Sequence, residues 1–280
     1  MSNYCMRFPG GRKKALTLSY DDAVEQDIRL MQILDKNGIK CTFNINTGCF
    51  APEGKVYEPG TIHRRMSKKQ SLELYTNSGH EVAVHALTHP HLERMTAAEI
   101  AYEVMTDKSN IEHDFATITR GMAYPFGTYN DEVVRTLESC GIVYSRTTKC
   151  TEGFGIPKDW LRLEATCHHK NPRLTELCDR FLQTDFAGEP GLFYMWGHSY
   201  EFDMHDNWEV IECFAEKMGG REDIWYATNI EIYDYCKAYE QLIFSSDSSL
   251  CYNPTAFDLY FGINDKVLMV KSGETVHLKG

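Results

Sequence analysis

The sequence lacks three features that would place it in other protein classes. No apolar run approaches the roughly 20 residues that a membrane-spanning helix needs. No long apolar stretch of the kind found in a secretory signal occurs in the opening residues, MSNYCMRFPGGRKK. No two of the ten cysteines have the C-x-x-C spacing of many zinc and redox motifs, so we interpret them as free thiols. We therefore expect a protein of the reducing cytoplasm with no membrane partner.

The sequence is also poor in positive charge. It holds 29 Lys and Arg residues against 40 Asp and Glu residues, which gives a formal net charge of -11. Basic residues cluster only at 11–14 and 63–69, and we interpret both clusters as solvated surface. Because proteins that bind a nucleic acid backbone need clustered Lys and Arg, we expect no nucleic-acid partner.

What the sequence does contain is an alternation of apolar, strand-like segments with amphipathic, helix-like ones. We expect strands at 14–20, 39–45, 80–86, 119–125, 142–148, 159–165, 191–198 and 223–229. We expect helices at 23–38, 67–79, from Thr96 onward, 131–141, 171–182, 207–220 and 230–242. Such repeated units predict an α/β fold with a parallel sheet covered by helices. Six to eight such units favour a closed or nearly closed barrel, which we expect to have about seven parallel strands.

The pattern changes after residue 242. Residues 243–280 show no helical period and contain short alternating stretches separated by turn-forming residues. We expect two parts, a barrel over 1–242 and a small antiparallel β extension over 243–280 that packs on the barrel. The alternative is a partly disordered tail, against which the apolar residues of this segment argue.

Acidic and imidazole side chains follow several of the predicted strands. The set comprises Asp21 and Asp22 after the first strand, His85 and His89 after the third, and His198 after a late apolar strand. Ligands of parallel α/β proteins bind at the carboxyl ends of the strands. There, these residues could give a metal ion three protein ligands and one open position. The alternatives are that Asp22 only caps a helix starting at Ala23 and that His198 is a core histidine.

Four separated segments resemble the motifs of a known family. The segments LSYDDA, GHEVAVHALTHPHL, AYPFG and FYMWGH are similar, in this order, to motifs of the polysaccharide deacetylases. This family is also called carbohydrate esterase family 4 or the NodB-homology fold, and GIKCTFNI is similar to its second strand. The resemblance covers residues 14–239 and does not reach the C-terminal extension. It implies a distorted (β/α) barrel, in agreement with the alternation.

The resemblance also implies roles for the residues at the strand ends. Asp21 matches the catalytic base, and His198 matches the general acid. The positions of the metal ligands are matched by Asp22, His85 and His89. The backbone N–H of Phe126, within 123–127, matches a donor that holds the oxyanion. These matches imply a divalent metal, with Zn²⁺ expected and Co²⁺, Ni²⁺ or Mn²⁺ as alternatives.

One residue of the family pattern is missing. The arginine that orients the base in the family's third motif is replaced by Ala123. We expect Arg162, in the predicted strand at 159–165, to take its place beside Asp21, with Arg120 as the second candidate. The alternative for either arginine is a surface salt bridge.

Aromatic and histidine side chains near the same strand ends are candidates for substrate contact. Sugar rings stack on aromatic faces, but large aromatic side chains are also ordinary core residues. Besides Phe126, the candidates are Tyr124, Trp160, Trp196 and, from the polar loop CHHKNPR, His169. For each of them, core packing or an inert exposed position is the alternative.

Together, the motifs predict a metal-dependent hydrolase that removes acetyl groups from an N- or O-acetylated carbohydrate. The lack of an export signal favours a soluble oligosaccharide or precursor as the substrate. One alternative is an amidohydrolase of the same fold that opens a small cyclic amide or ureide. The other is a catalytically silent carbohydrate-binding barrel, which only the missing arginine supports. The oligomeric state is left open.

Overall fold

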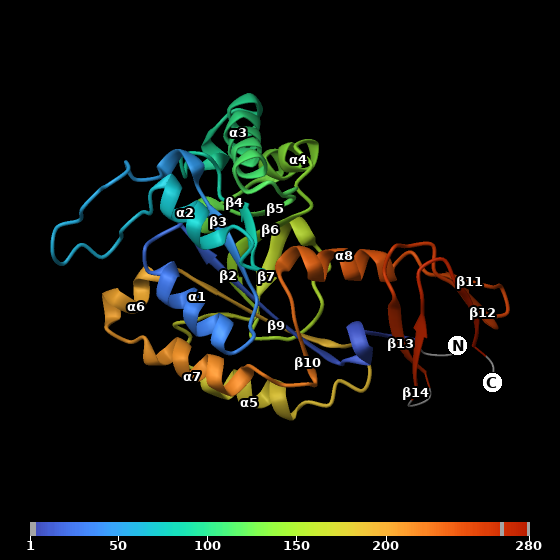
Figure 1. Cartoon of the computed structure of the whole chain (residues 1–280). Coiled ribbons are helices and arrows are strands. Elements are labelled where there is room, and N and C mark those ends of the chain that lie inside the picture. The colour runs from blue at the N-terminus through green and yellow to red at the C-terminus, as the bar shows by residue number, and fades with distance from the viewer. Residues whose placement is uncertain (1–3, 264–265, 279–280) are drawn as a thin grey trace.

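A parallel sheet that closes on itself forms the centre of the molecule (Figure 1). The computed structural model describes residues 4–263 and 266–278. Within them, nine strands form the sheet in the order β7-β6-β5-β4-β3-β2-β9-β8, with β10 paired to β2. Their bounds are β2 Lys14–Asp21, β3 Cys41–Ile45, β4 Glu81–Val84, β5 Gly121–Ala123, β6 Tyr144–Cys150, β7 Leu163–Ala165, β8 Cys167–His168, β9 Gly191–Gly197 and β10 Ile224–Tyr226.

The barrel closes because its two terminal strands are consecutive in the chain. Only Thr166 separates β7, which pairs with β6, from β8, which pairs with β9. The backbone N–H of Thr166 donates to the Tyr194 carbonyl at 2.8 Å and so continues the pairing across the junction. Strand β10 pairs with only the first three residues of β2 and lies outside the order of the other eight strands. The predicted α/β fold with a distorted barrel is therefore confirmed.

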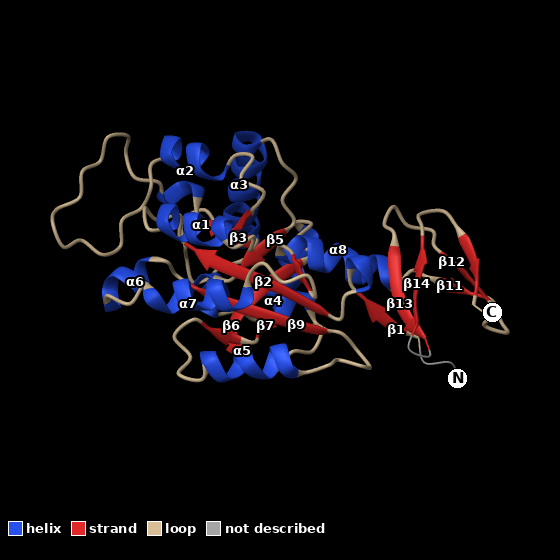
Figure 2. Ribbon diagram, turned by 60° about the horizontal axis from the view of Figure 1, so that its bottom comes forward, coloured by secondary structure: helices blue, strands red, loops and turns tan. Residues whose placement is uncertain are grey.

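Helices pack around the outside of this sheet (Figure 2). Their bounds are α1 Asp27–Lys36, α2 Lys68–Tyr75, α3 Ala97–Phe115, α4 Asp131–Ser139, α5 Leu174–Gln183, α6 Tyr200–His205, α7 Glu209–Met218 and α8 Asn229–Tyr239. The helix starts at Ser67, Thr96 and Asn130 are confirmed, because each of these side chains accepts a hydrogen bond from a backbone N–H in the first turn. Short α6 was not predicted from the sequence.

Two predicted boundaries are wrong. Helix α1 begins at Asp27 rather than Ala23, because Asp22 and Ala23 have left-handed backbone conformations, with φ of 90° and 51°. Asp22 is therefore not a helix cap. The expected strand at 159–165 begins as a 3₁₀ turn over Trp160–Arg162, because the Asp159 carboxylate accepts backbone N–H groups of this turn.

The C-terminal extension consists of antiparallel strands, as expected. One sheet has the order β1-β13-β14 and the other β11-β12-β15. The bounds are β1 Cys5–Arg7, β11 Ile243–Phe244, β12 Leu250–Tyr252, β13 Leu259–Ile263, β14 Lys266–Val270 and β15 Thr275–His277. Strand β1 comes from the N-terminus and pairs with β13. The division of the chain into a barrel over 1–242 and an extension over 243–280 stays a prediction. Residues 1–3, 264–265 and 279–280 of these two parts lie outside the described residues.

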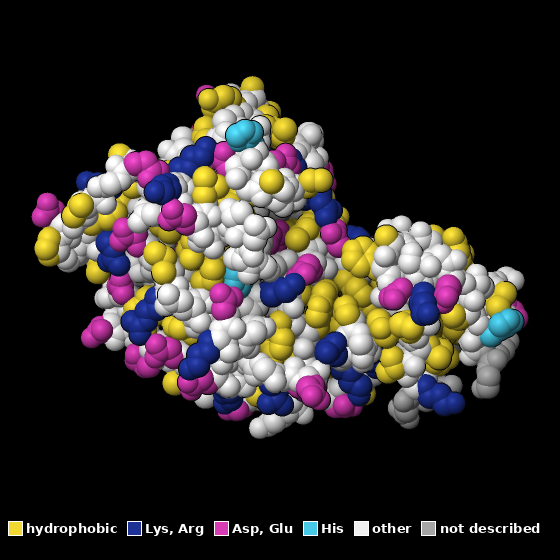
Figure 3. Space-filling view, viewed as in Figure 1, with side chains coloured by type: hydrophobic (Ala, Val, Ile, Leu, Met, Phe, Trp, Pro, Cys, Tyr) yellow, Lys and Arg dark blue, Asp and Glu magenta, His cyan; other side chains and the backbone are white. Residues whose placement is uncertain are grey.

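The surface carries both signs of charge. On the face shown in Figure 3, Lys and Arg side chains are interspersed with Asp and Glu side chains. Among the described helices, none combines the length and the apolar character needed to cross a membrane.

Candidate metal centre

One carboxylate and two imidazoles converge where strands β2 and β4 end. Asp22 directly follows β2, His85 directly follows β4, and His89 lies in the loop after it. One ligand atom from each of the three lies within 4.8 Å of the other two. The Nε2 atom of His89 is 4.0 Å from Oδ1 of Asp22. This expected trio is therefore brought together by the fold.

A hydrogen bond orients the His85 ring, and both imidazoles are neutral, as metal ligands must be. Nδ1 of His85 lies 2.8 Å from the Ala123 carbonyl oxygen, so this nitrogen carries the proton and Nε2 keeps its lone pair. Burial lowers the pKa of His85, and burial together with neighbouring His85 lowers the pKa of His89 to about 4. At neutral pH both rings can therefore donate a lone pair to a cation.

Strained backbone conformations place these residues. Four residues at this end of the barrel have φ between +57° and +90°, namely Asp22, Ala86, His89 and Phe126. For residues other than glycine such conformations cost free energy, and they persist where the surrounding contacts enforce them, most often at functional sites.

A loop whose basic residues we interpreted as solvated surface holds Asp22 in place. Nη2 of Arg65 donates to Oδ1 of Asp22 at 2.9 Å, and Nε2 of His63 lies 3.2 Å from Oδ2. Although burial raises the pKa of Asp22, the hydrogen bond from His63 and the charge of Arg65 hold this pKa well below its ordinary value. In the sequence, the basic segment HRR at 63–65 was visible, but no spacing or motif indicated that it would contact Asp22.

Behind the centre, helix α3 anchors the segment that carries His85. The Asp107 carboxylate accepts the His85 backbone N–H at 3.1 Å and the Thr47 backbone N–H at 2.7 Å. The Asn46 amide donates to the His85 and Ala86 carbonyls. These buried contacts fix where His85 emerges from the strand end.

Asp21 lies beside the trio and is buried, with 3% of its surface exposed. Nδ2 of Asn44 donates to its Oδ1 at 2.9 Å, and the Arg146 guanidinium donates to Oδ2. Nε2 of His198 lies 3.7 Å from the same Oδ2. Burial raises the pKa of Asp21, but Arg146 and the neighbouring histidines together lower it by more, so the pKa lies below its ordinary value. Asp21 is therefore ionised at neutral pH.

The arginine beside Asp21 is Arg146, and the expectation that Arg162 lies there is wrong. Arg146 on β6 is paired with Ala123 on β5, the position at which the family motif has its arginine. The two positions therefore lie at the same level along the barrel. It is 1% exposed and stacks over the Trp196 ring at 4.4 Å. Arg162 instead pairs with Asp131 and Asp159 at the surface. The second candidate, Arg120, pairs with Asp234.

Next to His198, the Glu201 carboxylate lies close to histidines at the end of β8 and in the segments after β8 and β9. Oε2 of Glu201 lies 3.5 Å from Nδ1 of His198, 3.1 Å from Nε2 of His168 and 3.3 Å from Nε2 of His169. Its Oε1 accepts from Nζ of Lys170 at 2.6 Å. Burial raises the pKa of Glu201, but the hydrogen bonds from His168, His198 and Lys170 lower it by more. No pattern in the sequence had singled out Glu201.

We interpret this second cluster as a group of charged and polar side chains around Glu201 rather than as a second metal site. His168, His198 and Glu201 also lie close enough to share an ion. However, Nδ1 of His168 accepts the Lys170 backbone N–H at 3.1 Å, so the His168 proton is on Nε2, which faces Glu201. A nitrogen that carries a proton cannot bind a metal.

The residues expected to contact a substrate fall into two groups. Phe126 is 52% exposed beside the trio, and its ring contacts His89 edge-on at 4.5 Å and stacks on His91 at 4.0 Å. Trp196 lies under Arg146, and its Nε1 donates to Cys150. These two are the aromatic candidates that adjoin the centre.

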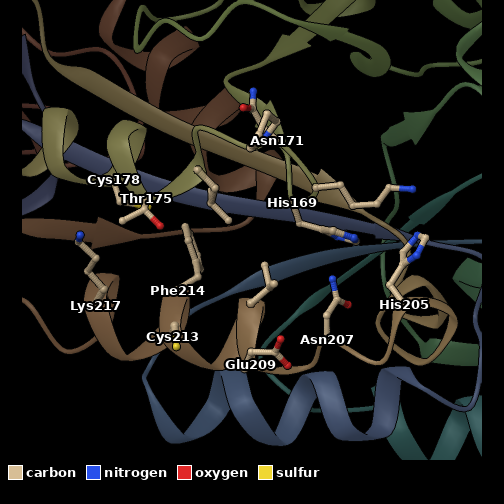
Figure 4. A pocket seen from close by; sticks show the side chains of 14 residues that line it. His169, Asn171, Thr175, Cys178, His205, Asn207, Glu209, Cys213, Phe214 and Lys217 are labelled. Carbon is tan, nitrogen blue, oxygen red and sulfur yellow. The ribbon is translucent and has the colours of Figure 1, made fainter.

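The other three candidates are core residues. Tyr124 is 1% exposed and donates to the Leu161 carbonyl at 2.7 Å, and Trp160 packs on Tyr233. His169 is 2% exposed and stacks on Phe202. It also lines a cavity of about 760 Å³ between α5 and α7, which Figure 4 shows and which none of the metal-ligand candidates lines.

Comparison with known proteins supports the motif assignment. The polysaccharide deacetylase family model matches residues 9–145. A chitooligosaccharide deacetylase from Bradyrhizobium sp. (strain ANU 289) is 33% identical over 85 residues, which cover 30% of this chain and 36% of that protein. The matched region thus spans about a third of the length of that curated relative. Residues 9–145 of the chain are therefore similar to the polysaccharide deacetylase family.

Solved structures share the fold. A family 4 carbohydrate esterase from Streptomyces lividans, in complex with acetate, gives a TM-score of 0.52 at 14% identity, covering 77% of this chain and 93% of that chain. The Xyl-CE4 domain of a multidomain xylanase from the hindgut metagenome of Trinervitermes trinervoides gives 0.51 at 14% identity, covering 80% and 92%. At this identity the likeness establishes the fold alone.

Proposed function

We propose that the chain is a metal-dependent hydrolase that removes acetyl groups from an N- or O-acetylated carbohydrate. The observation that carries this proposal is the convergence of Asp22, His85 and His89 on one point, with Asp21 and His198 beside it. The match of residues 9–145 to the polysaccharide deacetylase family and the similarity to a curated chitooligosaccharide deacetylase support the substrate class.

The trio suits a divalent cation, and Zn²⁺ in particular. Two neutral imidazoles and one carboxylate are a ligand set of catalytic zinc sites, which keep a further position open. When bound, such a cation lowers the pKa of a water molecule and polarises a carbonyl group. Co²⁺, Ni²⁺ and Mn²⁺ accept the same donors and are the alternatives.

The side chains around the trio supply the proton transfers. Asp21 is ionised and held by Arg146 and Asn44, so it can take the proton of the attacking water. The Phe126 backbone N–H, on the turn beside His89, donates to the oxyanion that forms from the acetyl carbonyl. His198 then gives its Nε2 proton to the leaving nitrogen or oxygen of the sugar.

His198 is suited to the role of the acid. Burial alone lowers its pKa, but the hydrogen bond to Glu201 and the charges of Asp21 and Asp22 outweigh burial, so the pKa is raised. With Nδ1 facing Glu201, the proton available for transfer is on Nε2, which faces Asp21. The surroundings of Asp21 lower its pKa, and those of His198 raise its pKa. These opposite shifts suit Asp21 to the role of the base and His198 to that of the acid.

The two other hypotheses from the sequence lose their support. The silent barrel rested on the missing arginine, and Arg146 contacts Asp21 where that arginine would. An amidohydrolase of this fold can work without a metal, so the assembled Asp22, His85 and His89 trio argues against that alternative.

The decisive experiment measures acetate release from a panel of N- and O-acetylated oligosaccharides, with cyclic ureides as competing substrates. We expect chelation to abolish acetate release and added Zn²⁺ or Co²⁺ to restore it. The His85→Ala variant should lose both metal and activity, whereas the exposed His113→Ala control should keep both. Full activity of metal-free protein, or hydrolysis of ureides alone, would refute the proposal.

A further inference from the structure

A carboxylate outside the metal centre connects the two sides of the site. Asp27 opens helix α1 and is fully buried. Its Oδ1 accepts from the Ser199 hydroxyl at 2.6 Å. Its Oδ2 accepts from the Tyr75 hydroxyl at 2.6 Å and from the Val24 backbone N–H at 3.2 Å.

Two of these three partners adjoin the reacting groups in the chain. Val24 lies two residues after Asp22, in the turn where Asp22 and Ala23 have positive φ. Ser199 directly follows His198, in the loop after β9. A single side chain therefore bonds both the turn that follows the base and the loop that carries the acid. The third partner, Tyr75, ends helix α2 and belongs to neither loop.

The chemistry of Asp27 argues for more than general stability. A buried carboxylate loses its hydration, and this burial raises the pKa of Asp27 to about 7 despite three hydrogen bonds. An apolar side chain of similar size would avoid this cost. A serine hydroxyl can both donate and accept, so the link to Ser199 survives whether or not Asp27 carries a proton. The side chain thus keeps the two loops joined across neutral pH.

We propose that Asp27 is a positioning residue that, through Ser199, sets the distance between His198 and Asp21. This inference rests on the proposed function, because it assigns a purpose to the 3.7 Å separation of the acid and the base. The link between Asp27 and Ser199 does not involve the metal trio, so its loss should appear in turnover and not in the retention of metal.

The test compares two hydroxyl deletions on the same carboxylate. Ser199→Ala removes the contact with the acid loop, and we expect kcat to fall about 10- to 100-fold with KM and bound zinc unchanged. Tyr75→Phe removes an equally short contact that does not reach the acid loop, so it should lower the melting temperature but leave kcat unchanged. Asp27→Ala combined with Ser199→Ala should have a kcat no lower than that of the slower single variant, because both substitutions remove the same hydrogen bond.

Crystal structures separate the failure of this inference from the failure of the proposed function. If the wild-type protein releases no acetate from any substrate, the proposed function falls. The Ser199→Ala structure still tests the positioning role, through a changed separation of His198 Nε2 and Asp21 Oδ2. An unchanged separation together with an unchanged kcat would overturn the inference, as would equal losses of kcat in Tyr75→Phe and Ser199→Ala. These variants keep the test valid even if Asp27→Ala does not fold.

Discussion

At the scale of single residues, the charge and the orientation of Asp21 depend on one buried arginine. Breaking a buried ion pair leaves an uncompensated charge, so its geometry matters more than that of a surface pair. The planar guanidinium of Arg146 both stacks on Trp196 and reaches Oδ2 of Asp21. A lysine keeps the positive charge but can reproduce neither contact in the same way.

We therefore predict unequal effects of the same substitution at two arginines. Arg146→Lys should lower the rate of acetate release about 100-fold, because the base is displaced. Arg162→Lys should leave the rate near that of the wild type, since Arg162 forms exposed pairs with Asp131 and Asp159. Steady-state kinetics of both variants check this prediction, and an equal loss in the two would contradict it.

The acid side of the site predicts a change in pH dependence. His198 must be protonated to act, so the rate falls as pH rises through its pKa, which Glu201 helps to raise. Glu201→Gln removes the negative charge and should move this alkaline limb to lower pH by about 1–2 units, the equivalent of a charge-assisted hydrogen bond. The exposed Glu209→Gln serves as the control. A limb that stays in place, or moves to higher pH, would exclude this role for Glu201.

At the scale of elements, the strands bring the reacting groups together and the loops fix them. Strand ends place Asp22 and His85, whereas the segment between β3 and α2 returns to the site and brings Arg65 onto Asp22. Outer partners of this kind orient a metal ligand, and their loss typically weakens metal binding about 10- to 100-fold.

For that reason, Arg65→Met should weaken zinc binding by about 10- to 100-fold. The neighbouring Arg64→Met is the matched control, because Arg64 pairs with Glu25 and Asp203 rather than with Asp22. Competition with a chromophoric chelator measures both affinities. Equal affinities of the two variants would show that the loop does not support the metal centre.

At the scale of the whole molecule, the extension shares a hydrophobic core with the barrel. Leu259 of β13 is fully buried in one cluster with Tyr235 and Ala238 of α8. The Tyr235 hydroxyl donates a hydrogen bond to the Arg7 carbonyl and accepts one from the Tyr260 backbone N–H. Helix α8 is therefore hydrogen-bonded to both β1 and β13. The extension therefore contributes to the stability of the chain.

This shared core predicts the cost of two substitutions within the extension. Leu259→Ala should lower the free energy of unfolding by about 2–5 kcal/mol, the usual cost of emptying a packed core position. Val267→Thr, on the neighbouring strand, should change it by about 0.5 kcal/mol or less, since Val267 is 51% exposed. Urea unfolding followed by circular dichroism measures both. Equal stability of the two variants would mean that the extension and the barrel are energetically independent.

The sequence by itself determined the barrel and the residues at its strand ends. Local signals set the strands and the capped helix starts at Ser67, Thr96 and Asn130, because periodicity and capping depend on neighbours in the chain. The parallel order of the strands then brings Asp22, His85 and His89 to one end of the sheet. The order of residues therefore indicated a shared site at the strand ends, and the resemblance to the family motifs singled out the trio within it.

Only the tertiary structure decided which partners hold those residues. Arg146 stands opposite Ala123 because of the register between β5 and β6, and register cannot be derived from either strand alone. Glu201 lies on α6, a helix too short to have a periodic pattern, and Arg65 reaches Asp22 through the return of a long loop. Contacts between residues distant in sequence depend on how whole elements pack. Local patterns and the family motifs therefore predicted the reacting groups but not the residues that hold them.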